Sequence, residues 1–246
     1  MNFFEIIDSD LDKIKNQIVA VIGGGGKSSL IYRIGMELVE RDFKVILTST
    51  TKIQSMPGIE LIIQNETKDF MTRVSEILEK NKIVTLAKEK YKGEKLSGLD
   101  PATITTLRPL TDVILIEADG SRQRSLKTHK EYEPVIPPDT NTVIIICGAN
   151  IVGAPLNDEN VHRAELFAQK WRLSFNDLLD PEIIASELLS PDSYLRNVPP
   201  HSNVVLYINK SDLNPEGALK LVNILKQKCD YRLFSGSLLN NSLKRH

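Results

Sequence analysis

Four consecutive glycines precede a lysine and two serines in this chain, and these residue types together suit phosphate binding. Glycines let backbone N–H groups approach an anion closely, and a helix that starts directly after them points its positive N-terminal end at the same place. Lys27 is expected to reach the outer phosphates of a nucleotide, and the Ser28 hydroxyl is a ligand for Mg²⁺. The predicted nucleotide-binding residues of this segment are Gly23, Gly24, Gly25, Gly26, Lys27, Ser28 and Ser29. The alternative is a glycine-rich turn that carries a surface lysine.

The glycine segment is shorter than the common phosphate-loop consensus. Gly-x-x-x-x-Gly-Lys-[Ser/Thr] requires a glycine at position 21, where this chain has Val21. The pattern present is Gly-x-x-Gly-Lys-Ser, from Gly23 to Ser28, and it resembles the ATP loop of the Mur ligases. This form favours ATP as the nucleotide.

Two carboxylates follow an apolar run, in the sequence Glu117-Ala-Asp-Gly120. Mg²⁺ prefers hard oxygen ligands, so Glu117 and Asp119 are predicted, together with Ser28, to hold the ion. With Lys27 they are also the predicted catalytic residues. Because they are two residues apart, both would project to the same side of a continuing strand. The sequence does not favour one over the other, and both could instead cap local N–H groups. The Glu-x-x-Gly form resembles the corresponding motif of nickel-insertion and CobW-type GTPases.

The segment Asn209-Lys-Ser-Asp212 fits the Asn-Lys-x-Asp pattern of GTPases. Guanine presents two adjacent N–H donors, and the single carboxylate of Asp212 can accept from both, whereas adenine lacks that pair. Asn209 is expected to steady the loop, and the Lys210 stem to lie over the base. The alternative is an ordinary turn in which Ser211 or Asp212 starts a helix. The sequence thus leaves ATP and GTP both open.

Further polar residues are candidates for substrate binding or for a switch that responds to hydrolysis. Hydroxyls at 48–51 could face the terminal phosphate, or could bond within their own turn. The basic stretch 121–138 could bind an anionic substrate or a partner, or could be a solvated loop. The candidates are Thr50, Thr51, Lys52, Arg122, Lys127, Glu133, His162 and Arg163.

Strand and helix patterns alternate along the chain, which predicts an α/β fold. We expect a three-layer, mostly parallel sheet of the P-loop NTPase-like kind with helices on both faces. Ligands of such sheets lie outside the carboxyl ends of the strands, where all of these motifs fall. The expected strands are 18–22, 44–47, 83–87, 113–116, 143–147, 204–208 and 231–234.

Helical spacing predicts helices between these strands. One follows the glycine segment, one begins at a Thr67 cap, a short one runs from Pro101 to Leu107, one includes Val161 and Trp171, and one opens at Asn214-Pro215. The charged stretch 88–97 is expected to be a solvated loop, with a ligand-binding lid as the alternative.

The whole chain, 1–246, is expected to form one domain. Residues 175–200 show two short helical pieces separated by prolines, and they could form a small helical insertion within that domain.

Composition excludes several functional classes. The net charge is −1 with a pI near 6.5, so a general affinity for nucleic acid is not expected. No apolar run approaches the roughly 20 residues of a membrane helix, and the start of the chain lacks a basic leader. The 2 cysteines are far apart, which predicts buried thiols in a reducing cytoplasm and no thiolate metal site.

Together the motifs resemble the selenium-dependent molybdenum hydroxylase accessory family, the YqeC-like proteins. The matching pieces are Ile22–Leu30, Thr50–Lys52, Glu117–Ser121, Lys127, Glu133–Pro137, Val161–Arg163 and Asn209–Asp212. The family commonly has Lys-Thr where this chain has Lys27-Ser28, which keeps a hydroxyl for Mg²⁺. The resemblance implies a cytoplasmic nucleotide-binding protein that helps to mature molybdenum hydroxylases, with such an enzyme or other maturation proteins as partners.

Three functions are consistent with these residues. The first is a Mg²⁺-dependent NTPase that acts as a maturation factor. The second is a kinase or an ATP-dependent ligase, which the short loop and the basic stretch would serve. The third is a module that senses ATP or GTP without catalysis. No nucleophile motif is present in the sequence, and this favours phosphoryl transfer or hydrolysis, which depend on positioning and electrostatics.

Overall fold

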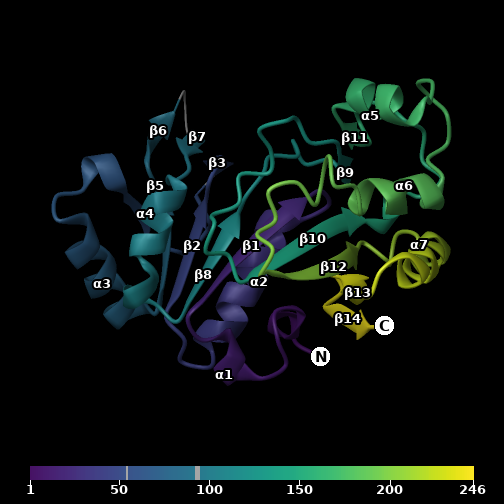
Figure 1. The fold of residues 1–246 in the computed structure, drawn as a ribbon. Helices are drawn as coiled ribbons and strands as arrows, with labels where there is room; N and C mark the ends of the chain where they lie inside the picture. The colour runs from purple at the N-terminus through teal and green to yellow at the C-terminus, as the bar shows by residue number, and fades with distance from the viewer. Residues whose placement is uncertain (54, 92–94) are drawn as a thin grey trace.

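The computed structural model describes residues 1–53, 55–91 and 95–246, and a large sheet lies at its centre (Figure 1). Within these residues the sheet has nine strands in the order β14-β13-β12-β10-β1-β8-β2-β5-β4. Neighbouring strands are parallel except for β13 and β14. The strands are β1 (Gln17–Gly23), β2 (Val45–Ser49), β4 (Leu61–Ile63), β5 (Ile83–Ala87), β8 (Val113–Glu117), β10 (Thr142–Gly148), β12 (Asn203–Asn209), β13 (Arg232–Ser237) and β14 (Ser242–Arg245). The α/β fold with a mostly parallel sheet is therefore confirmed.

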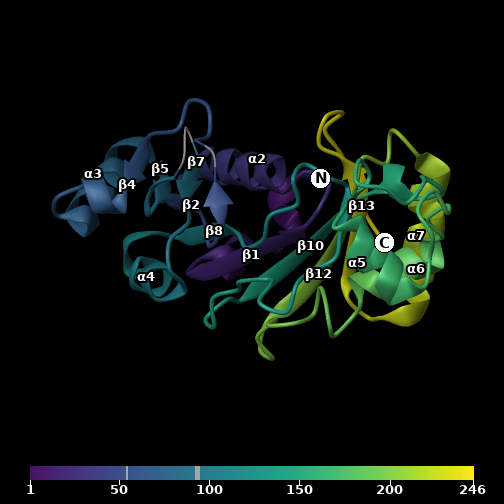
Figure 2. The same ribbon diagram turned by 90° about the horizontal axis from the view of Figure 1, so that it is seen from above.

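Helices cover both faces of the sheet, so that α2 and α4 lie on opposite sides (Figure 2). They are α1 (Leu11–Ile14), α2 (Lys27–Val39), α3 (Phe70–Asn81), α4 (Pro101–Thr106), α5 (Ala164–Trp171), α6 (Pro181–Leu188) and α7 (Pro215–Lys228). Short 3₁₀ turns are η1 (Phe3–Ile6), η2 (Gln64–Glu66), η3 (Arg108–Leu110) and η4 (Ala149–Ile151). The central strands are buried on both faces, which explains their continuous apolar runs.

The two faces form two separate cores, because successive side chains of a strand point to opposite faces. In β1, Val19 and Val21 pack with Leu30 and Ile34 of α2 on one face. Ile18, Ala20 and Ile22 pack on the other face with residues of α3, α4, α6 and α7. Burial on both faces fixes the orientation of β1 and its position in the sheet, and therefore also the position of the glycine segment at its end.

The chain changes direction across the sheet at β1. The segment from β1 to β5 builds one half of the sheet, β8 returns to lie between β1 and β2, and the chain then crosses to β10 on the other side of β1. In open α/β sheets, ligands bind outside the carboxyl ends of the strands at such a switch point. The glycine segment lies at this point.

Two small sheets project beyond the carboxyl edge of the large sheet (Figure 1). One contains β3 (Lys52–Ile53), β7 (Lys95–Ser97) and β6 (Glu89–Tyr91), and the other pairs β9 (Leu126–Lys127) with β11 (Val161–His162). The solvated loop expected at 88–97 is therefore wrong for the described parts of that stretch, which form antiparallel strands. Residues 92–94 lie outside the described residues.

Three other local expectations are corrected. Helix α3 begins at Phe70 after Asp69, while the Thr67 hydroxyl bonds to the Ile63 carbonyl, 2.7 Å away, and caps no helix. Val161 belongs to β11, and α5 begins only at Ala164. Residues 175–200 contain one helix, α6, and turns are found where a second short helix was expected. The apolar face of α6 joins the core beneath the sheet.

Candidate functional site

The glycine segment makes a tight turn from β1 into α2. Gly23, Gly25 and Gly26 have φ values of 102°, 92° and 127°, a region that side chains strongly disfavour. A side chain at Gly24 is excluded for another reason, because its Cβ would lie 2.5 Å from the Arg124 carbonyl oxygen. The run of glycines is thus required by the shape of the turn and by the chain that packs over it.

The N–H groups of the first three glycines point into the protein. Gly23 N–H donates to Asp119 Oδ2 at 2.9 Å, Gly24 N–H to the Ile146 carbonyl at 2.9 Å, and Gly25 N–H to the Arg124 carbonyl at 2.8 Å. In this structure these three amides already have protein acceptors, and the nucleotide-binding role expected of Gly23, Gly24 and Gly25 stays a prediction.

The N–H groups at the start of α2 remain as the anion donors. The first N–H groups of a helix have no partner inside it. Within the described part of the chain, the amides of Gly26, Lys27, Ser28 and Ser29 have no acceptor. Their partial positive charge adds to the helix dipole at the same place.

Ser28 and Glu117 face each other beside this helix start. Ser28 Oγ donates to Glu117 Oε2 at 2.6 Å, and the Ser28 side chain is exposed. The pairing of β1 with β8 brings them together, because it sets Glu117 opposite Val21. An exposed hydroxyl next to a carboxylate is a pair of hard oxygen donors, which suits Mg²⁺.

Lys27 is turned inward, with 3% of its surface exposed. Its Nζ donates to the Gly23 carbonyl at 2.7 Å and to Ser121 Oγ at 3.1 Å, and lies 3.1 Å from Asp119 Oδ1. Glu117 Oε1 is 3.7 Å away. In this arrangement the ammonium group neutralises carboxylates of the protein itself.

Asp119 is fully buried, with Oδ2 accepting from Gly23 N–H and Oδ1 beside the Lys27 ammonium group. Burial alone would raise the pKa of Asp119, but Lys27, Lys127 and a hydrogen bond from His129 outweigh it and hold the pKa well below its usual range. The strand ends at Glu117, so the two carboxylates do not continue side by side as expected. Glu117 reaches Ser28, whereas Asp119 bonds to Gly23 N–H instead, and the metal role expected of both carboxylates stays a prediction.

Behind Asp119 lies a second layer of charges. Lys127 is fully buried, and its Nζ lies 3.4 Å from Asp119 Oδ2 and 3.2 Å from Glu133 Oε2. Glu133 also forms a two-pronged pair with the Arg163 guanidinium. Burial opposes the charge of Glu133, yet Arg163 and Lys127 lower its pKa to about 2. Lys127, Glu133 and Arg163 thus belong to one ion-pair network, and the substrate or switch role expected of them stays a prediction.

His129 is the main site residue that the predicted set omitted. Its Nε2 lies 2.6 Å from Asp119 Oδ2, and its Nδ1 lies 3.2 Å from Ser193 Oγ. The ring meets Tyr194 edge-on, with 4.6 Å between centroids, and burial lowers the pKa of His129. Its place in the basic stretch was visible in the sequence, but its depth depends on packing against residues 64 and 65 positions away.

The Asn209 motif contacts the glycine segment from the other side. Asn209 Nδ2 donates to the Gly25 carbonyl at 2.7 Å, and Asn209 Oδ1 accepts from Leu238 N–H at 3.1 Å. Asn209 therefore links β12, the glycine turn and the chain after β13, in agreement with the steadying role expected for it. Lys210 donates to Ser125 Oγ at 2.9 Å, and Asp212 is exposed.

The remaining candidates lie around this centre. Thr51 Oγ1 is 3.2 Å from Ser49 Oγ, which fits bonding within its own turn, whereas Thr50 Oγ1 donates to the carbonyl of the distant Val135 at 2.7 Å. Lys52 lies in β3 and is exposed. His162 is half-buried, and burial together with Arg163, Lys127 and Arg122 lowers its pKa to about 4. Arg122 is exposed, with φ of 48°.

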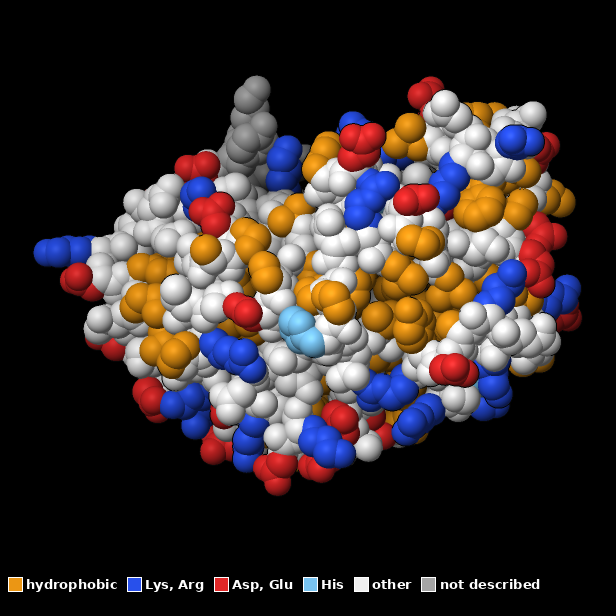
Figure 3. Space-filling model, viewed as in Figure 1, with side chains coloured by type: hydrophobic (Ala, Val, Ile, Leu, Met, Phe, Trp, Pro, Cys, Tyr) orange, Lys and Arg blue, Asp and Glu red, His pale blue; other side chains and the backbone are white. Residues whose placement is uncertain are grey.

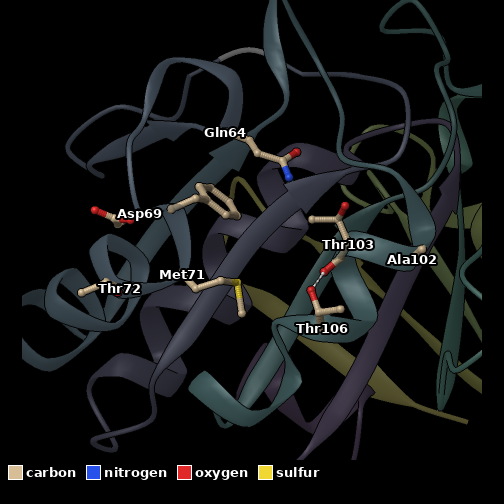
Figure 4. A pocket seen from close by; sticks show the side chains of 8 residues that line it. Gln64, Asp69, Met71, Thr72, Ala102, Thr103 and Thr106 are labelled. Carbon is tan, nitrogen blue, oxygen red and sulfur yellow. Dashed lines mark hydrogen bonds between the residues drawn. The ribbon is translucent and has the colours of Figure 1, made fainter.

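Hollows lie elsewhere on the molecule, away from the glycine turn. One of about 590 Å³ is lined by residues of η2, α3 and α4, among them Gln64, Met71 and Thr103 (Figure 4). Another of about 460 Å³ lies beside the start of α7. The face drawn in Figure 3 shows acidic and basic side chains interspersed among the described residues, without a continuous basic surface. The candidate site is thus defined by backbone donors and charged side chains.

Other chemistry finds less support. Among residues 1–53, 55–91 and 95–246, there is no cluster of three or more His, Cys, Asp or Glu side chains that could hold a metal ion. Cys147 is buried, which raises the pKa of its thiol to about 12, while Cys229 is only half-buried, in contrast to expectation. In the same residues, every helix is too short or too polar to cross a membrane.

The parallel sheet, the glycine turn at its switch point and the Lys-Ser pair at the start of α2 define a P-loop NTPase-like α/β protein. The chain belongs to the YqeC protein family, which matches residues 19–165. It is 31% identical over 207 residues to the YqeC protein of Escherichia coli (strain K12), covering 83% of this chain and 80% of that protein.

Two solved structures are similar to the chain over most of its length. One is the cell division protein FtsY from Thermotoga maritima, with 14% identity and a TM-score of 0.45 over 99% of this chain and 71% of that one. The other is FtsY from Mycoplasma mycoides, with 13% identity and a TM-score of 0.39 over 99% of this chain and 70% of that one.

Proposed function

We propose that this protein binds a nucleoside triphosphate with Mg²⁺ at the start of α2 and hydrolyses it slowly. The observation that carries the proposal is the 2.6 Å contact between Ser28 Oγ and Glu117 Oε2, directly beside four N–H groups that have no acceptor among the described residues. A hydroxyl, a carboxylate and converging N–H donors at a switch point form a site for a metal-bound phosphate.

The residues present fit the ion. Ser28 and Glu117 would hold Mg²⁺, and phosphate oxygens and water would complete a set of hard oxygen ligands. When bound, Mg²⁺ would neutralise part of the phosphate charge. A nucleotide brings its own oxygen ligands, so the site does not require a larger cluster of protein side chains.

The side chains of this protein would bind and position the nucleotide. The amides of Gly26 to Ser29 would hold the phosphates, and Lys27 would turn from Asp119 towards the outer phosphates. Glu117 would orient water at the terminal phosphate. Phosphoryl transfer needs such positioning and no covalent nucleophile. We expect slow turnover, because the described site offers no second cation beside the exposed helix start.

The contacts of Asn209 support guanine as the base. Asn209 joins the glycine turn to the chain at Leu238, and Ser211 N–H donates to the Gly236 carbonyl at 3.0 Å. The loop after β12 and the loop after β13 are therefore held together beside the phosphate site. In this proposal the exposed carboxylate of Asp212 accepts the two N–H donors of guanine, which leaves ATP the weaker ligand.

The proposed biological role follows from the family resemblance. As a member of the YqeC family the protein would act in the cytoplasm as a maturation factor for selenium-dependent molybdenum hydroxylases. Its partners would be such an enzyme or other maturation proteins. Nucleotide binding would then control when it associates with them.

Calorimetric titration with GTP and ATP, with Mg²⁺ or with EDTA, tests the proposal. We expect Mg²⁺-dependent binding, which Ser28→Ala weakens by about tenfold or more because a ligand of the ion is lost. Ser29→Ala is the matched control, since its exposed hydroxyl lies next in the helix and makes no contact with Glu117. Wild-type protein that binds neither nucleotide, or equal losses in both variants, would contradict the proposal.

Phosphate release distinguishes hydrolysis from sensing. Wild-type protein should release phosphate slowly, and Glu117→Gln should reduce this release more than it reduces binding. If Glu117→Gln binds nucleotide and releases phosphate at the wild-type rate, the role assigned to Glu117 is wrong.

A further inference from the structure

Charged side chains of both signs meet beneath the glycine turn. Three of them are cations and three are carboxylates, and each cation contacts at least one carboxylate within 4 Å. They are Lys27, Lys127, Arg163, Glu117, Asp119 and Glu133. The three positive and three negative formal charges cancel, so the cluster has no net charge.

Nucleotide binding would disturb this balance, an argument that rests on the proposed function. If Lys27 turns to the phosphates, Asp119 Oδ1 loses the ammonium group 3.1 Å away. Asp119 is fully buried, and no hydrogen bond to Oδ1 exists within the described residues. A buried carboxylate without a counter-charge is strongly destabilising. The bound state therefore needs another cation at Asp119.

Lys127 is placed to supply that charge. Its Nζ lies 3.4 Å from Asp119 Oδ2, whereas Lys27 pairs with Oδ1. The Gly120 carbonyl accepts from Lys127 Nζ at 2.7 Å, and Glu133 Oε2 does so at 3.2 Å. Lys127 has no exposed surface, so it cannot itself reach a phosphate in solvent.

The carboxylate is also held in place independently of Lys27. Gly23 N–H donates to Asp119 Oδ2 at 2.9 Å, and His129 Nε2 lies 2.6 Å from the same atom. When Lys27 and Glu117 turn to the nucleotide and its ion, Lys127 and Arg163 remain with Asp119 and Glu133. The charges left in the interior still balance.

We propose that Lys127 is the positioning residue that neutralises Asp119 and thereby frees Lys27 to bind the phosphates. It acts through Asp119 and touches no part of the nucleotide. Without it, Lys27 would be the main counter-charge of Asp119 and would be retained in the interior.

A double-mutant cycle tests this coupling by calorimetry with Mg²⁺ and GTP. The four proteins are wild type, Lys127→Met, Asp119→Asn and the double variant. Lys127→Met should weaken binding by about a hundredfold, because the bound state would contain an unpaired buried charge. In the Asp119→Asn background the same change should cost about threefold or less, since no charge needs compensation.

Lys130→Met is the matched control, because Lys130 is an exposed lysine three residues along the same segment. It should change affinity by about twofold or less, as expected for a screened surface charge. Equal losses from Lys127→Met in both backgrounds, or no loss in either, would overturn the inference. Failure of wild type to bind nucleotide would instead overturn the proposed function.

Lysine side-chain NMR keeps the inference testable if Lys127→Met does not fold. With ¹³Cε-labelled lysine in wild-type protein, addition of Mg²⁺ and GTP should shift two buried signals, those of Lys27 and Lys127. Lys27→Met, in which Lys127 already serves Asp119 alone, identifies the second signal. A Lys127 signal that stays unchanged while that of Lys27 moves would overturn the inference.

Discussion

Asp212 and Asn209 lie three residues apart but in different surroundings. Asn209 is buried and bonded on both sides, whereas Asp212 is exposed and available to a ligand. The structural part of the motif is therefore separate from the part that would read the base. Substitution of Asp212 should affect recognition with little effect on the fold.

Asp212→Ala should reduce affinity for GTP by about 2–3 kcal/mol and affinity for ATP little, because only guanine offers two donors to this carboxylate. Calorimetric titration of both nucleotides measures the difference. Asp230→Ala, which removes another exposed carboxylate, is the control. Equal losses for GTP and ATP would remove the argument for guanine.

Glu117 and Asp119 show what sequence could and could not predict about single residues. Their place after an apolar strand predicted that both carboxylates lie near the phosphate loop, and both do contact Lys27. Their separate roles depend on depth: Glu117 reaches the exposed Ser28, while Asp119 turns inward to Gly23 and His129. How deeply each side chain is buried depends on residues from other parts of the chain. The separation of the two carboxylates by two positions could therefore not reveal it.

Helix α7 begins at a cap that also joins it to the rest of the fold. Asn214 Oδ1 accepts from Gly217 N–H at 2.9 Å, and Asn214 Nδ2 donates to the carbonyls of Val152 and Ala149 at 3.0 and 3.3 Å. One side chain thus satisfies the helix start and the turn η4 beside it. The sequence Asn-Pro predicted this start correctly.

Asn214→Ala should lower the free energy of unfolding by about 1–2 kcal/mol, because it removes both the cap and the bonds to η4. Urea denaturation measures this change. Asn223→Ala, at an exposed position within the same helix, is the control and should have little effect or be slightly stabilising. Equal destabilisation by the two variants would contradict the role given to the cap.

Elements of the sheet interior were predictable, and those at its edges were not. The central strands have long apolar runs because both of their faces are buried, and their bounds were predicted to within about two residues. β4 has three residues, and β14 has mostly exposed side chains, so neither shows a clear period. The small sheets of β3, β6, β7, β9 and β11 depend on pairing between distant segments, which local pattern does not encode.

The buried charges link the stability of the whole molecule to pH. Burial lowers the pKa of His129, and contacts with Arg163 and Lys127 outweigh burial to lower the pKa of Glu133 from 4.5 to about 2. A pKa that is lower in the folded state contributes stability above the unfolded pKa, and this contribution is lost as pH falls. The pKa is lowered in the folded state for both groups, so both reduce the free energy of unfolding as pH falls. This loss of stability begins near the ordinary histidine pKa of about 6.5 and continues below pH 4.5.

The free energy of unfolding should therefore fall between pH 6 and pH 3, with about 2 kcal/mol of the loss due to Glu133. Denaturant titrations at several pH values measure it. Glu133→Gln should be less stable at pH 7 and show a shallower decline, whereas the control Glu131→Gln, at an exposed neighbour, should keep the wild-type slope. An unchanged slope in Glu133→Gln would show that its ion pairs contribute nothing.

At the level of the entire chain, the convergence of distant motifs was predictable and the charge cluster was not. Parallel strands bring their carboxyl ends to one edge, so residues near 23, 117 and 209 were expected to meet. Lys127, Glu133 and Arg163 were candidates for substrate binding or for a switch, and the stretch 121–138 could equally have been a solvated loop, because sequence alone gives no measure of burial. In the structure the pairing of β9 with β11 brings this stretch into the interior.

The chain from Ser121 to Lys127 packs directly on the glycine turn: the Arg124 carbonyl accepts from Gly25, and Lys210 reaches across to Ser125. A peptide that copied only the first strand, the turn and the following helix would leave three glycine amides without their acceptors. In another scaffold that peptide should therefore form a flexible turn that does not bind triphosphate. The unit that can be transferred, or exchanged by recombination between relatives, therefore comprises the glycine turn, the carboxyl ends of β1, β8, β10 and β12, and the segment Ser121–Lys127 that packs on the turn.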